Sequence, residues 1–298
     1  MIPQKTSRLV LGFLIGIPSL VLLTVASSLW HHSASQNNAP AKNASSIGAL
    51  QPINSAILAD APSAAHQGLD DPSFLRKLIL TTDDYAVRIE LRRRLFHLLR
   101  KGKRSDEAIQ QLKELLDDIE RQEGESMAQR VALAEANTLE LQHDYAVAVR
   151  AYDLLERRYQ SGPFTAEAMN HQAQCLLDSK EYLQAERVWA RLTTEYADSA
   201  IAPWAWRKIA LAQLLQSRFD DSLNTLDQMI VLYPRTEFEE YARMRRGYVQ
   251  VKAERNAEAK QSYDAFLGFC PSSKYCRLAA LQRTAIDVSE SIGARASH

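Results

Sequence analysis

Glycine and proline are scarce in this sequence. There are 10 of each among 298 residues, which is about 7% of the chain against roughly 12% in an average protein. Folds rich in strands and loops need frequent turn residues, so this composition argues against a β-rich enzyme and favours long helices. The length is sufficient for one or two domains with a substantial core.

The chain also lacks an excess of charge of either sign. It has 36 basic and 36 acidic side chains, whereas a nucleic-acid-binding domain is usually clearly basic, so we expect no nucleic-acid partner. Residues 88–104 are locally basic, but residues 105–122 are acidic. Antiparallel packing of two such helices would place opposite charges side by side. We therefore interpret 88–104 as a solvated face rather than a site for nucleic acid or anionic lipid.

Motifs that carry chemistry are missing too. The sequence contains no G-x-S-x-G, no phosphate-binding G-x-x-x-x-G-K-[ST], no H-E-x-x-H and no C-x-x-C. The acidic pairs Asp117–Asp118 and Asp220–Asp221 are interpreted as solvated surface, because a catalytic dyad needs shielding to separate its pKa values. The sequence therefore predicts a non-enzyme with no catalytic residue, metal site or cofactor. The alternative is an enzyme, or a subunit of an enzyme complex, with an unrecognised site.

Only three cysteines are present. Cys175 lies within a predicted helix and is interpreted as a small core residue. Cys270 and Cys276 flank the last predicted turn, and in an oxidising compartment they could form a disulfide that ties the final hairpin to a capping helix. The alternative is a pair of packed thiols.

One long apolar run stands at the N-terminus. Leu9 to Leu29 contains no charged residue, and as a helix it would span about 31 Å, the thickness of a bilayer core. Lys5 and Arg8 precede it, so the positive-inside rule predicts a cytoplasmic start at 1–30 and an exoplasmic or periplasmic remainder. The alternative is a cleaved signal peptide, although its apolar core is usually only about 7–15 residues long.

Residues 31–72 are rich in alanine, serine, asparagine and proline and almost free of charge. Such a segment cannot bury enough apolar surface to offset the entropy of ordering. We therefore expect a flexible, disordered linker between a single transmembrane helix and a folded domain.

From residue 73 onward the apolar spacing predicts helices joined by connections of two to five residues, so that neighbouring helices pack as antiparallel hairpins. A short helix is expected at 74–80. The further predicted helices are 86–101, 105–122, 127–142, 145–160, 165–178, 182–196, 200–216, 219–232, 238–252, 256–269 and 274–290.

These helices repeat with a period of 37 residues. Small residues recur where the helices of a hairpin would cross closely, and large residues recur where they would fill the groove between hairpins. The small column is Ala136, Ala173, Ala210 and Gly247, and the large column is Tyr152, Trp189, Leu226 and Tyr263. A third column of residues favoured at helix starts is Gly162, Ser199, Thr236 and Ser273. Thr236 and Glu239 also have the spacing of a capping box.

This pattern resembles the tetratricopeptide repeat (TPR), with its small residues, its tryptophan (Trp206) and its closing prolines (Pro234 and Pro271). The period is longer than the usual ~34 residues. The resemblance implies an all-α, TPR-like α-solenoid of about four to five hairpins plus a C-terminal capping helix. It covers 127–290, after a degenerate first repeat or cap at 73–126 in which Phe96 replaces a small residue, and before a disordered tail at 291–298.

The junctions at 233–236 and 270–273 are similar to those of bacterial envelope TPR proteins, namely the Tol-Pal-associated coordinator and the outer-membrane assembly lipoprotein. An N-terminal anchor followed by repeats also resembles the ancillary Sec translocon subunit. The apolar run is not followed by the cysteine of a lipid anchor. The resemblance implies a scaffold that binds cell-envelope proteins from the inner membrane, with its repeats in the periplasm. A structural self-assembly role remains the alternative, and the oligomeric state is left open.

In TPR-like proteins the first helix of each hairpin lines a concave groove, and the resemblance places ten residues there. Trp204 and Arg207 would form the centre of an amphipathic groove for a peptide or helix, unless Trp204 packs against a neighbouring hairpin instead. The ten residues are Arg130, Asn137, Asn170, Gln174, Trp204, Arg207, Leu211, Tyr241, Met244 and Tyr248.

Overall fold

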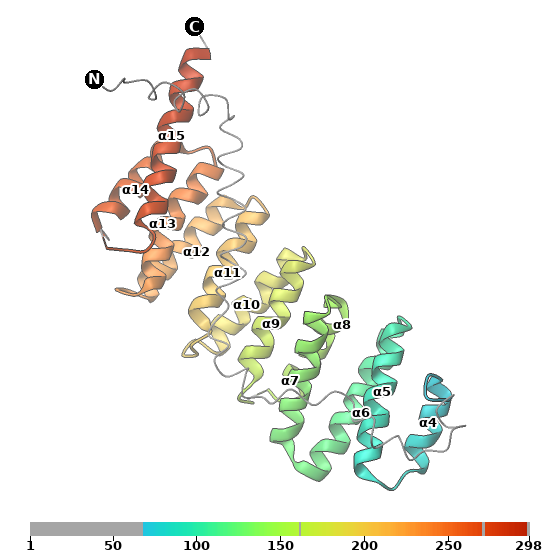
Figure 1. Cartoon of the computed structure of the whole chain (residues 1–298). Coiled ribbons are helices and arrows are strands. Elements are labelled where there is room, and N and C mark those ends of the chain that lie inside the picture. The colour runs from blue at the N-terminus through green and yellow to red at the C-terminus, as the bar shows by residue number, and fades with distance from the viewer. Residues whose placement is uncertain (1–67, 161, 270–271, 297–298) are drawn as a thin grey trace, which may run out of the picture. The chain divides into compact units, whose positions relative to one another are not determined.

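The computed structural model describes residues 68–160, 162–269 and 272–296 (Figure 1). Within these ranges the secondary structure consists of twelve helices and no strand. The helices are α4 (Pro72–Thr81), α5 (Tyr85–Lys101), α6 (Ser105–Glu123), α7 (Glu125–Leu141), α8 (Tyr145–Arg158), α9 (Thr165–Asp178), α10 (Tyr182–Glu195), α11 (Ala202–Leu215), α12 (Phe219–Leu232), α13 (Glu237–Lys252), α14 (Asn256–Phe269) and α15 (Cys276–Ala296).

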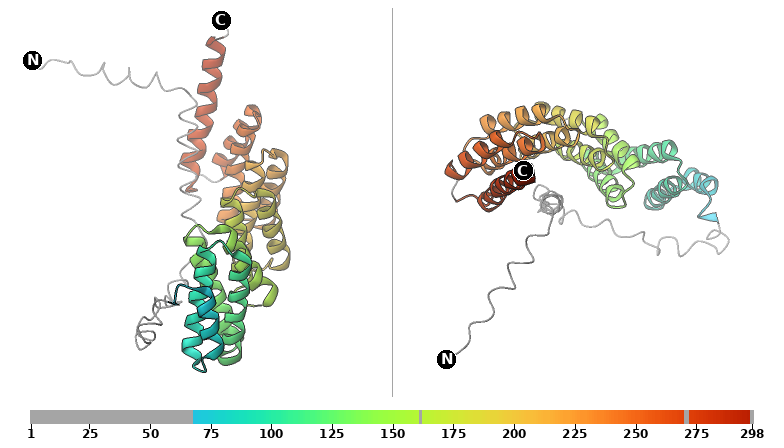
Figure 2. Two further views of the ribbon diagram at one scale, coloured as in Figure 1. Left: turned by 90° about the vertical axis from the view of Figure 1, so that its right-hand side faces the viewer. Right: turned by 90° about the horizontal axis from the view of Figure 1, so that it is seen from above.

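The helices are arranged as consecutive antiparallel hairpins. The described residues fall into two compact units, 68–234 and 235–296. In the first unit, α4 precedes the hairpins α5/α6, α7/α8, α9/α10 and α11/α12, and each helix packs against the next (Figure 2). In the second unit, α13 and α14 form a hairpin and α15 packs on α14. Five hairpins and a C-terminal helix confirm the predicted TPR-type solenoid.

The two repeat columns lie in the core, as predicted. Tyr152, Trp189, Leu226 and Tyr263 are all fully buried. In the small column, a Cβ atom added to Gly247 would lie only 2.7 Å from the ring of Tyr263. The large and small columns therefore meet inside a hairpin. Phe96 is also fully buried, so the first hairpin accepts a larger residue in its core.

The turn inside each hairpin has a common geometry that the sequence did not reveal. One residue in each turn has a positive φ, between 57° and 65°. The amide of this residue and the amide of the next residue bond back to the end of the first helix in the Schellman pattern. In the α7/α8 turn, the amides of His143 and Asp144 donate to the carbonyls of Glu140 and Leu139 at 2.9 and 3.0 Å. The residues with positive φ are Lys103, His143, Lys180, Ser217 and Glu254. Glycine, the usual signal for this conformation, is absent from all five positions.

Helix starts differ from the prediction in detail. Ser199 and Ser273 lie two residues or more ahead of their helices, where each hydroxyl oxygen accepts a backbone N–H, from Ala202 and Tyr275 respectively at 3.2 Å. The Thr236 side chain makes no cap hydrogen bond, so its half of the predicted capping box is wrong. The Glu239 carboxylate accepts the amide of Arg235 at 2.6 Å. The chain bends sharply at Arg235, which has a φ of 61°, and this brings its amide to Glu239.

The predicted terminal segments differ in how far the structure covers them. α15 continues to Ala296, six residues past the predicted end at 290, so most of the expected tail at 291–298 is helical. The predicted anchor at 9–29 and almost all of the linker at 31–72 lie outside the described residues. Among the helices that are described, none combines the length and the apolar character needed to cross a membrane.

Candidate protein-binding surface

The predicted groove residues divide between the two units. Seven lie on the first helices α7, α9 and α11 of the 68–234 unit, and we call their shared surface the first-helix face. The other three lie on α13 of the 235–296 unit. The first-helix face comprises Arg130, Asn137, Asn170, Gln174, Trp204, Arg207 and Leu211.

Trp204 and Arg207 form the most distinctive contact on this face. They stand three residues apart in α11, so their side chains lie on the same side of the helix. The guanidinium carbon of Arg207 lies 4.6 Å from the centre of the Trp204 ring, within the range of a cation–π interaction. Both residues are half-buried. The pair therefore offers a preorganised surface that is part aromatic and part cationic.

Asn137 and Asn170 have a supporting role that the sequence did not suggest. The hydroxyl of Tyr152 donates to Asn137 Oδ1 at 2.7 Å, and the indole N–H of Trp189 donates to Asn170 Oδ1 at 3.1 Å. Both aromatic rings belong to the buried large column, and a buried polar group without a partner is costly. The two asparagines therefore satisfy the polar atoms of the core from the first-helix face.

An ion pair joins α7 and α9 on the same face, and sequence reasoning missed it. Glu140 Oε2 lies 2.9 Å from His171 Nδ1, and the His171 ring stacks on Tyr152 at 5.8 Å between centres. Burial opposes protonation of His171, but the hydrogen bond with Glu140 and the negative charges of Glu140 and Glu167 together outweigh burial and raise the pKa of His171. Burial likewise favours neutral Glu140, but the hydrogen bond with His171, the charge of His171 and the hydrogen bond with Tyr152 together outweigh burial and lower the pKa of Glu140.

The Glu140–His171 pair is expected to make stability depend on pH. The raised pKa of His171 contributes stability that is present below its ordinary value of 6.5 and is lost as the pH rises through the raised value. The lowered pKa of Glu140 contributes stability that is present above 4.5 and is lost as the pH falls through the lowered value. The substitution His171→Gln should therefore lower the free energy of unfolding by up to about 1 kcal/mol at pH values between 4.5 and 6.5, the ordinary pKa values of the two groups. The loss should be smaller in alkaline solution.

Urea unfolding, followed by circular dichroism across a series of pH values, measures this difference. Glu140→Gln is the matched variant, because loss of either partner should flatten the same part of the curve of unfolding free energy against pH. A difference between wild type and His171→Gln that is as large in alkaline solution as at weakly acidic pH would contradict the assignment.

A second contact joins α9 and α11. The amine of Lys208 donates to Gln174 Oε1 at 2.8 Å, and the amide of Gln174 donates to Asp178 at 2.9 Å. Burial and the neighbouring charge of Arg207 lower the pKa of Lys208 to about 8. Gln174 is thus engaged in bonds within the protein, and Lys208 is a site residue that the sequence analysis did not identify. Lys208 belongs to none of the repeat columns, so the repeat pattern did not indicate a role for it.

Four of the predicted residues are less accessible, namely Leu211 on α11, which is 9% exposed and buried with the core, and the three on α13. Tyr241, Met244 and Tyr248 are 6%, 3% and 8% exposed. Met244 packs in the core with Tyr263 and Phe266, so it contributes to packing rather than to an open surface. The predicted disulfide stays a prediction, because Cys270 lies outside the described residues.

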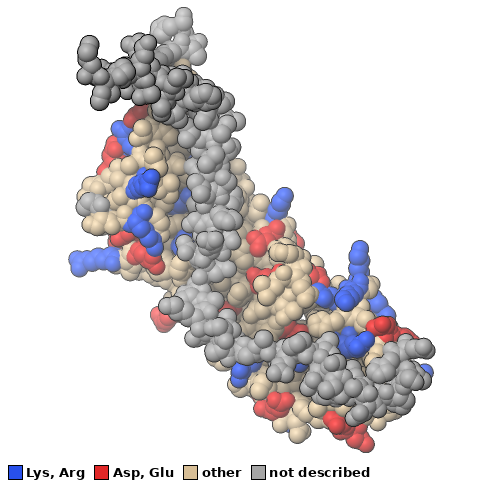
Figure 3. Space-filling view, in the orientation of Figure 1, with Lys and Arg blue, Asp and Glu red and all other residues tan. Residues whose placement is uncertain are grey.

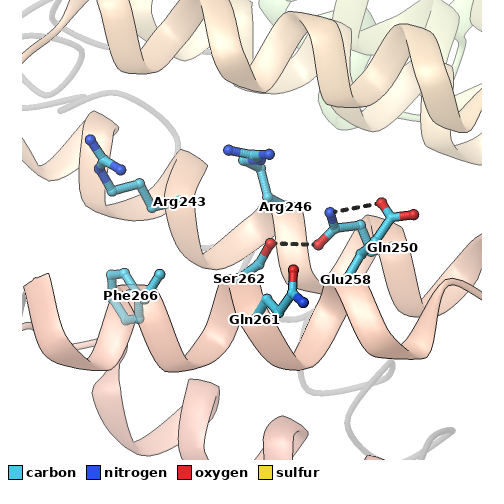
Figure 4. A pocket seen from close by; sticks show the side chains of 8 residues that line it. Arg243, Arg246, Gln250, Glu258, Gln261, Ser262 and Phe266 are labelled. Carbon is cyan, nitrogen blue, oxygen red and sulfur yellow. Dashed lines mark hydrogen bonds between the residues drawn. The ribbon is translucent and has the colours of Figure 1, made fainter.

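The α13/α14 hairpin also contains a hollow of about 300 Å³ (Figure 4). Arg243 and Arg246 reach over it from α13, and Ser262 and Phe266 line it from α14. Ser262 donates to Gln250 Oε1 at 2.6 Å, so polar groups of the lining already bond to one another. Within the described ranges, no three His, Cys, Asp or Glu side chains gather as metal ligands would.

Basic residues of α5 pair with acidic residues of α6, as predicted, but the interpretation of 88–104 as a solvated face was wrong for Arg92, whose side chain is only 14% exposed. Arg92 bonds to Glu114 and to Asp118 at 2.6 Å each. On the side shown in Figure 3, acidic and basic residues are interspersed rather than separated by sign. The interpretation of Asp118 as solvated surface was wrong: its side chain is 5% exposed and also bonds to Arg121. It is buried because it lies on the face of α6 that packs against α5.

Comparisons with known proteins add the following. No protein-family model matches the chain, and no curated protein matches it. Similar solved structures include MamA (residues 41 to the end) from Desulfovibrio magneticus RS-1, with 16% identity over 62% of this chain and 97% of that one, at a TM-score of 0.41. BtubC (BKLC) from P. vanneervenii is 12% identical over 76% of this chain and 93% of that one, at a TM-score of 0.44.

A third similar structure is the TPR2AB domain of yeast Sti1 in its complex with pHSP90, with 12% identity over 75% of this chain and 94% of that one, at a TM-score of 0.36. Similarities this distant do not identify a partner. The hairpins and the 37-residue repeat of this chain themselves define its fold, a TPR-like α-solenoid.

Proposed function

We propose that this protein is a non-catalytic, membrane-anchored scaffold whose first-helix face binds a segment of another cell-envelope protein. The observation that carries the proposal is the Trp204–Arg207 pair, held half-exposed on α11 at 4.6 Å. Tryptophan and arginine dominate the binding energy of many protein interfaces, because each offers a large contact area with a polar group at its end.

The neighbouring helix supports the same conclusion. Asn170 and Gln174 of α9 occupy the first-helix face beside α11, with their oxygens already bonded to Trp189 and Lys208. These bonds fix the side chains, so a partner would meet a surface that needs little reordering. Preorganisation of this kind raises affinity by lowering the entropic cost of binding.

A photo-crosslinking amino acid at position 207, in intact membranes, tests the proposal and names the partner. The matched control position is 157 on α8, where the Arg157 side chain is 77% exposed and pairs with Asp153 in its own helix. We expect a discrete protein adduct from position 207 and none from 157. Identical adduct patterns from both positions would refute the first-helix face.

Replacing Trp204→Ala together with Arg207→Ala should lower partner capture at least tenfold, because the largest contact of the face is lost. Arg157→Ala is the control and should leave capture unchanged. Circular dichroism verifies that the helical content of both variants is intact. Undiminished capture by the double variant would show that the partner binds elsewhere.

The membrane anchor and the exoplasmic location are part of the proposal, supported by the uncharged run Leu9–Leu29 and by Lys5 and Arg8 before it. A reporter enzyme fused after residue 31 tests both. The expected result is activity only from a reporter that works outside the cytoplasm. Activity only from a cytoplasmic reporter would overturn the topology.

A further inference from the structure

α15 carries an exposed apolar strip. Leu278, Leu281, Val288 and Ile292 are 36%, 60%, 47% and 52% exposed, and with Ala285 they follow one another at intervals of three, four, three and four residues. This is the spacing of the a and d positions of a coiled coil over two heptads. Side chains at this spacing lie along one side of a helix, so the five residues form one continuous strip.

The rest of α15 is already occupied by α14. Ala279 and Ile286 are buried against Tyr263 and Phe266. The charged side chains of α15 bond to the same neighbour: Lys260 of α14 bonds to Asp287 and Glu290 at 2.9 and 2.5 Å. At about 100° per residue, the apolar strip lies roughly opposite these charged residues. The strip is therefore directed away from α14.

The strip is not simply an unfinished end of the repeat. Gly247 and Gln250, which face α14 from α13, correspond after one period to Thr284 and Asp287 of α15. That side of α15 is polar, as the outer face of a terminal helix in a solenoid should be. The exposed apolar residues instead correspond to positions of the first-helix face: Leu278 lies two periods after Trp204, and Ala285 two periods after Leu211.

We propose that this strip pairs with the same strip of a second copy of the chain, antiparallel and about a two-fold axis at Ala285. The order of side chains is large, large, small, large, large, so an antiparallel copy places Leu278 against Ile292 and Leu281 against Val288. The small Ala285 at the centre lets the two helices approach closely. A symmetric interface needs a self-complementary patch, and an uncharged strip has no like charges to repel its copy.

The arrangement of charged side chains on α15 favours a second copy of the chain over a charged partner. Arg283, Asp287 and Glu290 of α15 are held in ion pairs with α14 or within the helix, so they are not directed toward an incoming segment. A seam of two heptads is about 21 Å long, and an interface this small belongs to the class of weak, transient contacts.

Two-tag co-purification of the full chain from detergent-solubilised membranes tests the pairing. One variant carries Leu281→Lys and Val288→Lys, and the other carries Leu281→Glu and Val288→Glu. Wild-type copies should co-purify, and each variant should co-purify with itself at least tenfold less, because like charges meet in the seam. Lys-variant and Glu-variant copies expressed together should recover most of the wild-type yield.

Recovery by the mixture would also show that neither variant fails through misfolding. Failure of the mixture, or self-association of either variant at the wild-type level, would overturn the proposal. A photo-crosslinker at position 281, with the exposed Ala280 as the control position outside the strip on the same helix, gives the second readout. An adduct of twice the chain mass from 281 alone supports the pairing, whereas an adduct with a different protein or with lipid from 281 contradicts it.

Discussion

Asp118→Ala should lower the free energy of unfolding by about 3 kcal/mol, because it removes one partner from a buried charge cluster. The Asp118 carboxylate bonds to Arg92 and to Arg121 at 2.6 Å and lies 3.6 Å from Arg88. Arg92 itself is only 14% exposed. Without Asp118, this guanidinium would keep Glu114 alone as its counter-charge.

The neighbouring Asp117 provides a matched control. Its side chain is 41% exposed and pairs with Arg158 at 2.5 Å, so Asp117→Ala should cost less than about 1 kcal/mol. Urea unfolding of the two variants and the wild type, followed by circular dichroism, measures both costs. Equal losses of unfolding free energy for the two adjacent aspartates would show that burial does not determine how much these ion pairs stabilise the protein.

The helices and their pairing could be predicted from the sequence because their signals are local and repeated. Each period supplies a small residue at one position and a large residue at another, so Ala173 and Trp189 indicate the same helix pair as Ala210 and Leu226 do one period later. Repetition also fixes the helix boundaries, since a displaced boundary would have to be displaced in every unit. The structure confirms these boundaries to within two residues, except for the end of α15, which lies six residues past its prediction because no later repeat marks it.

The contacts between first helices could not be predicted in the same way. The bonds from Glu140 to His171 and from Gln174 to Lys208 occur once each, so the repeat provides no second example of them. They also depend on which polar side chain of one hairpin meets which side chain of the next. The period aligns positions along the chain, but it does not specify partners across a helix interface.

The asparagines of the candidate site show the same limit. Asn137 and Asn170 were predicted as binding residues because they lie on the first helices. Their oxygens instead accept from Tyr152 and Trp189. A polar side chain on a partly exposed face can serve the core or a partner, and only the position of the aromatic donor distinguishes the two. The position of Trp204 could be predicted from the period, whereas its contact with Arg207 needed the structure.

Gly247→Ala should destabilise the α13/α14 hairpin by about 2 kcal/mol, because the core there has no room for one more methyl group. The added Cβ would lie 2.7 Å from two carbons of the Tyr263 ring. Tyr263 is fully buried, so the ring cannot turn into solvent. Alanine at the corresponding position of other hairpins shows that this close approach is a property of α13 and α14, where glycine permits it.

Gly268→Ala in the same hairpin should have the opposite effect. No atom lies within 4 Å of the added Cβ, and alanine favours a helix over glycine by up to about 1 kcal/mol. Hydrogen exchange of the amides in α13 and α14 measures both changes within this unit, with faster exchange expected for Gly247→Ala and slower for Gly268→Ala.

A second substitution separates steric crowding from helix propensity. Leucine and alanine already occupy the two positions one repeat earlier, as Leu226 and Ala210. Combining Gly247→Ala with Tyr263→Leu should therefore recover part of the lost protection, because the smaller side chain makes room for the methyl group. Protection that falls further in the double variant would mean that the Tyr263 ring supports the hairpin independently of its contact with Gly247, and that crowding at Gly247 is not the cause of the loss.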